Sequence, residues 1–211
     1  MRRLLGLGIG IALLGSAGSA HAFCRTTTDK SPPDFDATVN GCFSTGVPLF
    51  WRNACVGYSI ARSASKKISY EEAANNLSLA FTRWTGASCQ TDGNGRSRVS
   101  IDVRDLGPAD CAKVEYKSGV ANQNVILFRD DEWKYGSQVL GLTTVVYAPD
   151  NGEIYNADME INMFDMDPIA LRDPVGDQEY DFLSVVTHET GHFLGMAHSD
   201  VQNATMYARY D

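Results

Sequence analysis

The sequence predicts an α+β fold, with helices packed on a mixed, twisted sheet of the α/β type. Short stretches that alternate apolar and polar residues, which are typical of strands, occur on both sides of a helical stretch that begins after Ser69. A second helical stretch, at residues 180–196, follows the last of them. Because strands and helices follow one another in a chain without repeats, we expect a single sheet that the helices cover.

The first 22 residues predict a signal peptide. Two arginines precede an apolar stretch of 11 residues at 4–14, and residues 20–22, Ala-His-Ala, have the small side chains that a signal peptidase requires. A membrane anchor needs about 20 apolar residues, so this stretch is too short for one. We therefore expect cleavage after Ala22 and a secreted protein, of bacterial type and either extracellular or periplasmic, whose mature chain has no membrane span.

One domain is expected over residues 51–211, because a mature chain of this length can bury a complete core. Residues 23–50 are rich in Thr, Pro, Asp and Gly and predict an irregular segment before it. The stretches that predict strands lie, in chain order, at residues 56–62, 99–103, 125–128, 139–147 and 152–162. A turn cluster at residues 91–95 precedes the second of them.

The first helix has a clear start signal. Ser69 followed by Glu72 has the spacing of a capping box, in which each side chain bonds to the backbone of the other residue. Leu77, Phe81 and Trp84 then recur at helical intervals. These three side chains are expected to face the core.

The second helix carries the most informative motif. Residues 188–198 read HExxHxxGxxH, a spacing that builds a zinc site. On a helix, His188 and His192 lie four residues apart and project from one face, so both can reach one metal ion. Gly195 can adopt a positive φ and turn the chain back, which brings His198 to the same ion.

The ligand number indicates a catalytic site. Three imidazoles leave the fourth position of a tetrahedral zinc open for water, whereas structural zinc has four protein ligands. Glu189 is expected to take a proton from that water, so the predicted chemistry is hydrolysis of an amide. Without the signal peptide the chain has no histidine outside the motif, so we expect one zinc ion.

The motif and its flanks resemble the metzincin zinc endopeptidases, and the short spacing to Met206 resembles the matrixin branch. This resemblance implies a metzincin-like zincin catalytic domain in which the motif lies on the active-site helix and Met206 lies beneath the metal. Ser199 agrees with the matrixin pattern. Tyr210 is similar to a tyrosine that lines the specificity pocket, although Ala208 replaces the usual proline.

The resemblance extends upstream to residue 139. It implies that residues 139–147 form the edge strand above the cleft, where a protein or peptide substrate adds itself as an antiparallel strand. Gly141, Leu142 and Thr143 are then the expected substrate contacts. The alternative is an ordinary edge strand, because every open sheet has edges.

Charge excludes one class of partner. The formal net charge of −8 becomes −10 in the mature chain, since the signal peptide contains two arginines and no acidic residue. A nucleic-acid partner is therefore not expected, and the sequence carries no signal for an oligomeric state. Calcium, which matrixins commonly bind, could be held by aspartates expected in loops, although solvated loop charge is the simpler interpretation. These aspartates are Asp150, Asp158, Asp165, Asp167, Asp173 and Asp177.

Five cysteines follow the signal peptide, and an oxidising compartment favours disulfides between them. Cys42 with Cys55 and Cys89 with Cys111 are plausible local pairs, which leaves Cys24 over. Cys24 could instead be an inhibitory thiolate on the metal, as in matrixin zymogens, although its flanking residues differ. Because matrixins continue beyond the methionine turn, the end of the sequence also predicts a truncated catalytic domain whose missing part could hold a partner for the odd cysteine.

Three functional hypotheses follow. The first is a secreted zinc endopeptidase with Glu189 as general base. The second is a zinc-containing, non-catalytic module that binds peptides with the same fold, but the presence of Glu189 argues against it, since metal binding does not need that carboxylate. The third is a scaffold with structural zinc, which a set of three protein ligands disfavours.

Overall fold

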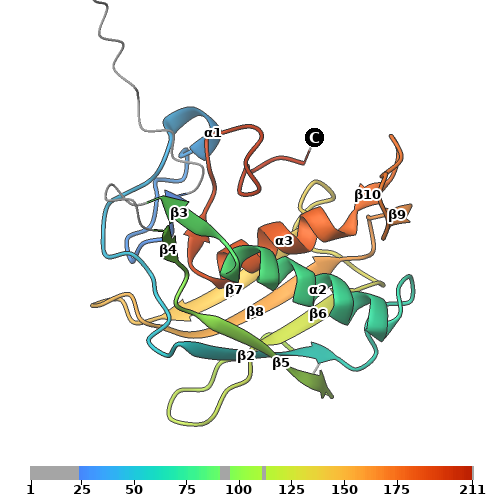
Figure 1. Ribbon diagram of the computed structural model, residues 1–211, viewed down its shortest axis with the longest axis horizontal. Coiled ribbons are helices and arrows are strands. Elements are labelled where there is room, and N and C mark those ends of the chain that lie inside the picture. The colour runs from blue at the N-terminus through green and yellow to red at the C-terminus, as the bar shows by residue number, and fades with distance from the viewer. Residues whose placement is uncertain (1–23, 91–95, 111–112, 211) are drawn as a thin grey trace, which may run out of the picture.

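The computed structural model describes residues 24–90, 96–110 and 113–210, and it confirms the predicted α+β class (Figure 1). The helices are α1 (Ala37–Asn40), α2 (Tyr70–Thr85) and α3 (Phe182–Phe193). The strands are β1 (Cys24–Arg25), β2 (Cys55–Ala61), β3 (Ser88–Gln90), β4 (Arg96–Arg98), β5 (Asp102–Ala109), β6 (Val125–Arg129), β7 (Gly141–Tyr147), β8 (Ile154–Asn162), β9 (Ile169–Ala170), β10 (Tyr180–Asp181) and β11 (Met196–Ala197).

A five-stranded mixed sheet, in the order β5-β2-β6-β8-β7, forms the centre of the molecule. The first four strands are parallel, and β7 is antiparallel to β8. The prediction of an edge strand at residues 139–147 is confirmed, because β7 ends the strand order. Both long helices, α2 and α3, cross one face of this sheet (Figure 1).

Aromatic rings connect the sheet to both helices. The Tyr58 ring on β2 lies 4.7 Å from that of Phe81 on α2, which lies 5.1 Å from that of Phe193 on α3. The predicted capping box of α2 is present in full, so this helix begins where the sequence indicates. The Trp84 indole of α2 donates a hydrogen bond to the carbonyl of Thr187 on α3, at 2.8 Å. These contacts fix α3 against the sheet.

Some predicted boundaries were wrong. The strand expected at residues 99–103 lies at Asp102–Ala109 and contains Pro108, which is tolerated because β5 is an edge strand. The last helix is shorter than expected, because Tyr180 and Asp181 form β10 and Asp181 is the N-cap. Its side chain accepts a hydrogen bond from the Ser184 amide at 3.2 Å. The turn cluster at residues 91–95 lies outside the described residues.

Asp158 was wrongly expected in a loop. It lies on β8 with 1% of its surface exposed, and it accepts hydrogen bonds from the backbone amides of Val125, at 2.9 Å, and Glu115, at 3.1 Å. Burial raises the pKa of its carboxyl, and those hydrogen bonds oppose the shift. The sequence misled because both faces of β8 are covered, so polar residues on it do not indicate exposure.

The predicted Cys42–Cys55 pair, with Cys24 left over, was also wrong. Cys24 forms a disulfide with Cys42, while Cys55 is an exposed free cysteine at the start of β2. The reason is tertiary: β1 pairs with β11, far away in sequence, and this places the Cα of Cys24 5.2 Å from that of Cys42. A disulfide-bonded Cys24 is not an inhibitory thiolate on a metal. Cys111 lies outside the described residues.

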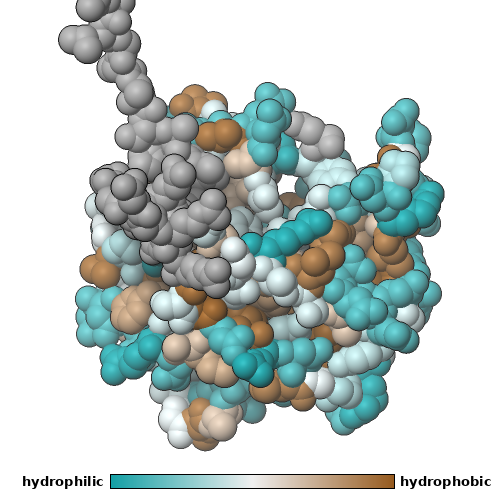
Figure 2. Space-filling view, viewed as in Figure 1, coloured by the Kyte–Doolittle hydropathy of each residue, from teal (hydrophilic) through white to brown (hydrophobic). Residues whose placement is uncertain are grey.

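The surface in the view of Figure 1 shows apolar side chains in small patches among hydrophilic ones, including one over α1 (Figure 2). In the part of the chain that the structure describes, no helix is both long and apolar enough to cross a membrane.

Peptide mapping tests the cysteine assignment. Digestion of the unreduced protein is expected to release Cys24 and Cys42 in one linked pair of peptides, and a thiol reagent applied to the native protein is expected to label Cys55, because that side chain is exposed and unpaired. The matched control is a Cys55→Ser variant, which removes this label and keeps the linked pair. A Cys42–Cys55 link in the wild type would contradict the structure.

Candidate active site

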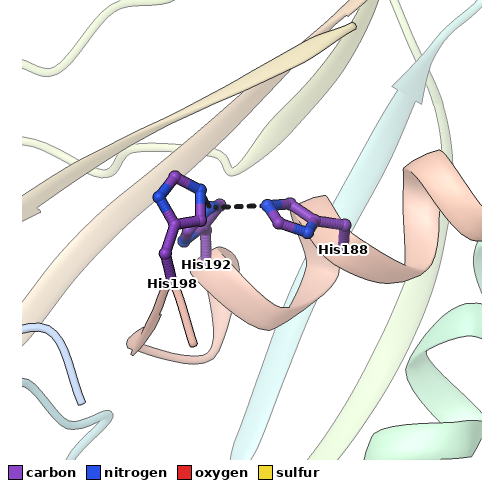
Figure 3. A group of neighbouring side chains, drawn as sticks. All are labelled: His188, His192 and His198. Atoms are coloured by element: carbon purple, nitrogen blue, oxygen red, sulfur yellow. Dashed lines mark hydrogen bonds between the residues drawn. The ribbon is translucent and has the colours of Figure 1, made fainter. Parts of the chain in front are cut away.

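Three histidines converge at the C-terminal end of α3 (Figure 3). His188 and His192 project from successive turns of α3, and the helix ends directly after them. Gly195 has a φ of +87°, a left-handed conformation that L side chains rarely adopt, and its carbonyl accepts the Thr26 amide at 3.0 Å. The chain therefore turns back through β11 and brings His198 to face the first two rings.

Backbone carbonyls fix the tautomers of two of these rings. The Nδ1 of His188 lies 2.8 Å from the carbonyl oxygen of Thr205, and the Nδ1 of His192 lies 2.8 Å from that of Met196. A carbonyl oxygen only accepts, so in the neutral rings each Nδ1 carries the proton and each Nε2 presents a lone pair. The Nε2 of His192 lies 3.1 Å from that of His188 and 3.2 Å from that of His198.

These three rings are neutral near pH 7. Burial lowers the pKa of His188 and His192, and it lowers the pKa of His198 to about 3, with the two neighbouring histidines adding to the effect and Asp36 opposing it. Two unprotonated nitrogens cannot share a hydrogen bond at 3.1 Å, so their lone pairs repel unless a cation lies between them. This donor set fits a metal ion that prefers imidazole, as zinc does.

Glu189 lies against the edge strand β7. Its carboxylate Oε2 accepts a hydrogen bond from the Thr143 hydroxyl at 2.7 Å, and a side chain at position 141 would bring a Cβ within 2.6 Å of the Glu189 Cγ. A larger residue there would displace the Glu189 side chain. Burial raises the pKa of the Glu189 carboxyl, whereas His188 and the Thr143 hydroxyl act to lower it. Gly141 and Thr143, which the sequence proposed as substrate contacts, thus also hold the side chain of Glu189.

Met206 is fully buried and lies against α3 at Gly191, which stands between the first and second histidines in sequence. A Cβ added at Gly191 of α3 would overlap the Met206 Sδ, so the two residues are in close contact. The Met206 carbonyl accepts the Ser199 amide at 2.7 Å, which ties the turn to the residue after His198. The sequence predicted Met206 but not Thr205 and Met196. These two residues orient the imidazoles through backbone carbonyls, which every residue type has, so no motif indicates them.

A cleft of about 1200 Å³ contains this group. Its lining includes the three histidines and Glu189, all three β7 residues proposed as substrate contacts, and Tyr210. The Tyr210 hydroxyl accepts a hydrogen bond from the Asp181 amide, and its ring lies 5.8 Å from that of Tyr180. The residues that the sequence proposed for substrate binding therefore share one cleft with the histidines.

Within residues 24–90, 96–110 and 113–210, the three histidines are the one group of three side chains that could together hold a metal ion. The aspartates considered for calcium form no such group there, and calcium stays a prediction. Asp165, for example, accepts a hydrogen bond from the Asn162 side chain at 2.9 Å.

A helix with two histidines, a third histidine after a glycine turn and a buried methionine against that helix define the metzincin class of metal site on a mixed sheet. The sequence profile of the matrixin peptidase family matches residues 50–211. The chain belongs to the matrixin family.

One curated relative is similar over a shorter stretch. The metalloendoproteinase 1-MMP of Arabidopsis thaliana is 38% identical over 69 residues, which cover 33% of this chain. The matched stretch covers 18% of the plant protein, so this chain spans less than a fifth of its length.

The contact between Gly191 and Met206 predicts that alanine at position 191 lowers the stability of the protein, which is the opposite of the usual effect in a helix. Glycine to alanine inside a helix normally stabilises a protein by about 1 kcal/mol. A Gly191→Ala variant is instead expected to be destabilised by about 1–3 kcal/mol, since the new methyl group overlaps the Met206 sulfur. Urea unfolding measures the change.

A double-mutant cycle supplies the control for this prediction. Met206→Ala alone is expected to lower stability, because it leaves a cavity. Combined with Gly191→Ala it should cost less than the sum of the two single changes, as the added methyl group then enters vacated space. If the two stability changes simply add in the double variant, or if Gly191→Ala stabilises the protein, the added methyl group does not overlap the Met206 side chain.

Proposed function

We propose that this protein is a secreted zinc-dependent endopeptidase in which His188, His192 and His198 hold the zinc ion and Glu189 is the general base. The observation that carries the proposal is the convergence of three imidazole Nε2 atoms, with that of His192 3.1 Å and 3.2 Å from the other two, beside a buried carboxylate. Membership of a peptidase family supports the same activity.

The three imidazoles hold the ion through Nε2. The Thr205 and Met196 carbonyls keep two of those nitrogens unprotonated and aimed at one point, and such partners of the second ring nitrogen are typical of metal-binding histidines. Zinc, when bound, supplies Lewis acidity that polarises a peptide carbonyl and makes water a stronger acid. Met206 stabilises the turn that supports the third histidine.

Glu189 moves the proton. Its carboxylate takes a proton from the attacking water, the water oxygen bonds to the carbonyl carbon of the substrate, and the carbon–nitrogen bond breaks as Glu189 returns the proton to the leaving amine. Thr143 occupies Oε2, which leaves Oε1 for this transfer. Burial raises the pKa of the Glu189 carboxyl and so makes the carboxylate a stronger base toward the attacking water.

The substrate class follows from the open edge of β7. An extended peptide can add to this edge through main-chain hydrogen bonds, which bind protein chains without selecting their sequence. Selectivity then depends on side chains in the cleft, where Leu142 and Tyr210 are proposed contacts. The signal peptide predicted at residues 1–22 supports secretion.

Loss of the general base tests the enzyme assignment. Glu189→Gln keeps the size of the side chain and a partner for Thr143 but removes the base, so cleavage of unfolded casein or gelatin is expected to fall by about 100-fold or more. Bound zinc, measured by elemental analysis, is expected to stay at one ion per chain, and a chelator is expected to abolish wild-type cleavage. Equal cleavage by the wild type and the variant would exclude the proposed mechanism, and zinc without any wild-type cleavage would favour a binding module.

The Thr143 hydroxyl is expected to position the carboxylate of Glu189. Thr143→Val keeps the shape and removes the donor, so kcat should fall by about 10-fold to 100-fold while KM changes little, because substrate binding does not need that hydroxyl. Thr143→Ser restores the hydroxyl and is expected to recover most of kcat. If the serine and valine variants lose activity equally, the hydrogen bond has no positioning role.

A further inference from the structure

A second cavity, of about 530 Å³, has His198 in its lining and no residue of α3. Most of its lining comes from residues 25–43, which precede the region matched by the family profile. Tyr147 at the end of β7 and Ala197 of β11 complete it. The matrixin family profile therefore does not account for this cavity.

The cavity continues the active-site cleft. Thr26, Tyr147 and His198 line both spaces, so a chain that leaves the histidines along β7 enters the second cavity directly. The side chain of Thr143 lies at Glu189, and Tyr147 lies four residues further along the same strand. At about 3.3 Å per residue, the cavity begins roughly 13 Å from the general base.

The direction of β7 decides which part of a substrate arrives there. A peptide that adds antiparallel to β7 runs from the Tyr147 end towards the Gly141 end. Residues opposite Tyr147 therefore precede the bond that is cleaved, by three or four positions. The pairing of β7 with β8 shifts register between Val146 and Tyr147, and the Tyr147 hydroxyl donates a hydrogen bond to the Thr28 carbonyl at 3.3 Å.

The segment that forms the cavity wall is held in place at several points. The Cys24–Cys42 disulfide closes it, and β1 pairs with β11 next to His198. The Thr26 hydroxyl donates to the Met196 carbonyl at 3.0 Å, and the Leu49 amide donates to the Thr26 carbonyl at 2.8 Å. A wall tied to the strand directly before a proposed metal ligand presents a preformed surface to the substrate.

Three aromatic side chains in the lining favour an apolar ligand, although polar residues line most of the rest of the cavity. The rings of Phe35 and Phe43 form an edge-to-face pair, with centroids 5.6 Å apart and planes at 72°, and Tyr147 adds a third ring. The charged members are Arg25, Asp29 and Lys30, all exposed and of both signs, so they give no strong preference for an acidic or a basic ligand.

We propose that the disulfide-bonded segment 24–49 adds a substrate pocket to the enzyme, which binds a large aromatic side chain three or four residues before the cleaved bond. This inference rests on the proposed endopeptidase activity. It assigns a role in selectivity to Phe35 and Phe43, which lie outside the family match, together with Tyr147 of β7.

Two fluorogenic peptides test the pocket. They are identical except that one has phenylalanine and the other serine at the third and fourth positions before the cleaved bond. Wild-type enzyme is expected to cleave the phenylalanine peptide with a kcat/KM about tenfold higher, because only that peptide buries an aromatic ring in the pocket. In Phe43→Ala and Phe35→Ala variants the ratio is expected to fall below about threefold.

Val39→Ala is the matched control, since Val39 lies in the same segment, is 78% exposed and does not line the cavity. It is expected to retain the wild-type ratio. The ratio compares two peptides with the same preparation of each variant, so partial loss of folded enzyme does not alter it. If an alanine variant is inactive, Phe43→Leu takes its place. A wild-type ratio near one, or a ratio that the Phe35 and Phe43 variants leave unchanged, would overturn the pocket, whereas failure to cleave either peptide would count against the endopeptidase itself.

Discussion

The repulsion between imidazole lone pairs is the constraint on which the site depends. Two backbone carbonyls, of Thr205 and Met196, hold the protons of His188 and His192 on Nδ1, so the Nε2 atoms face each other without a proton between them. Such an arrangement is costly without a cation and favourable with one. The turn after α3 and the methionine turn therefore matter chemically, because each of them contributes one of these carbonyls.

Two glycines allow the surrounding elements to approach closely enough. Gly141 lets β7 pass against the Glu189 side chain, and Gly191 lets α3 rest on Met206. In both places a methyl group would overlap a neighbouring atom. The close contact of β7 with Glu189 also means that a peptide added to the free edge of β7 lies near the general base, so the same packing serves both proton transfer and substrate alignment.

The sequence predicted the parts of this site that depend on local spacing. His188, Glu189 and His192 follow from helical periodicity, and the capping box of α2 from a three-residue interval. The sequence did not predict the features that depend on contacts between residues far apart in the chain. Cys24 pairs with Cys42 because β1 joins β11, and Asp158 is buried because a loop covers the second face of β8. The hydrogen bond from Thr143 to Glu189 likewise links residues 46 positions apart.

The pairing of β1 with β11 links selectivity to catalysis. Cys24 lies opposite Ala197, the residue directly before His198, so the strand that leads into the third histidine is also the strand that anchors the disulfide-bonded segment. A substrate side chain pressed against Phe35 and Phe43 is thus connected to the proposed metal ligand through one short pair of strands. Because that connection is hydrogen-bonded and closed by a disulfide, the added pocket keeps a fixed position relative to the histidines, and a peptide is selected by side chains well before the bond that is cleaved.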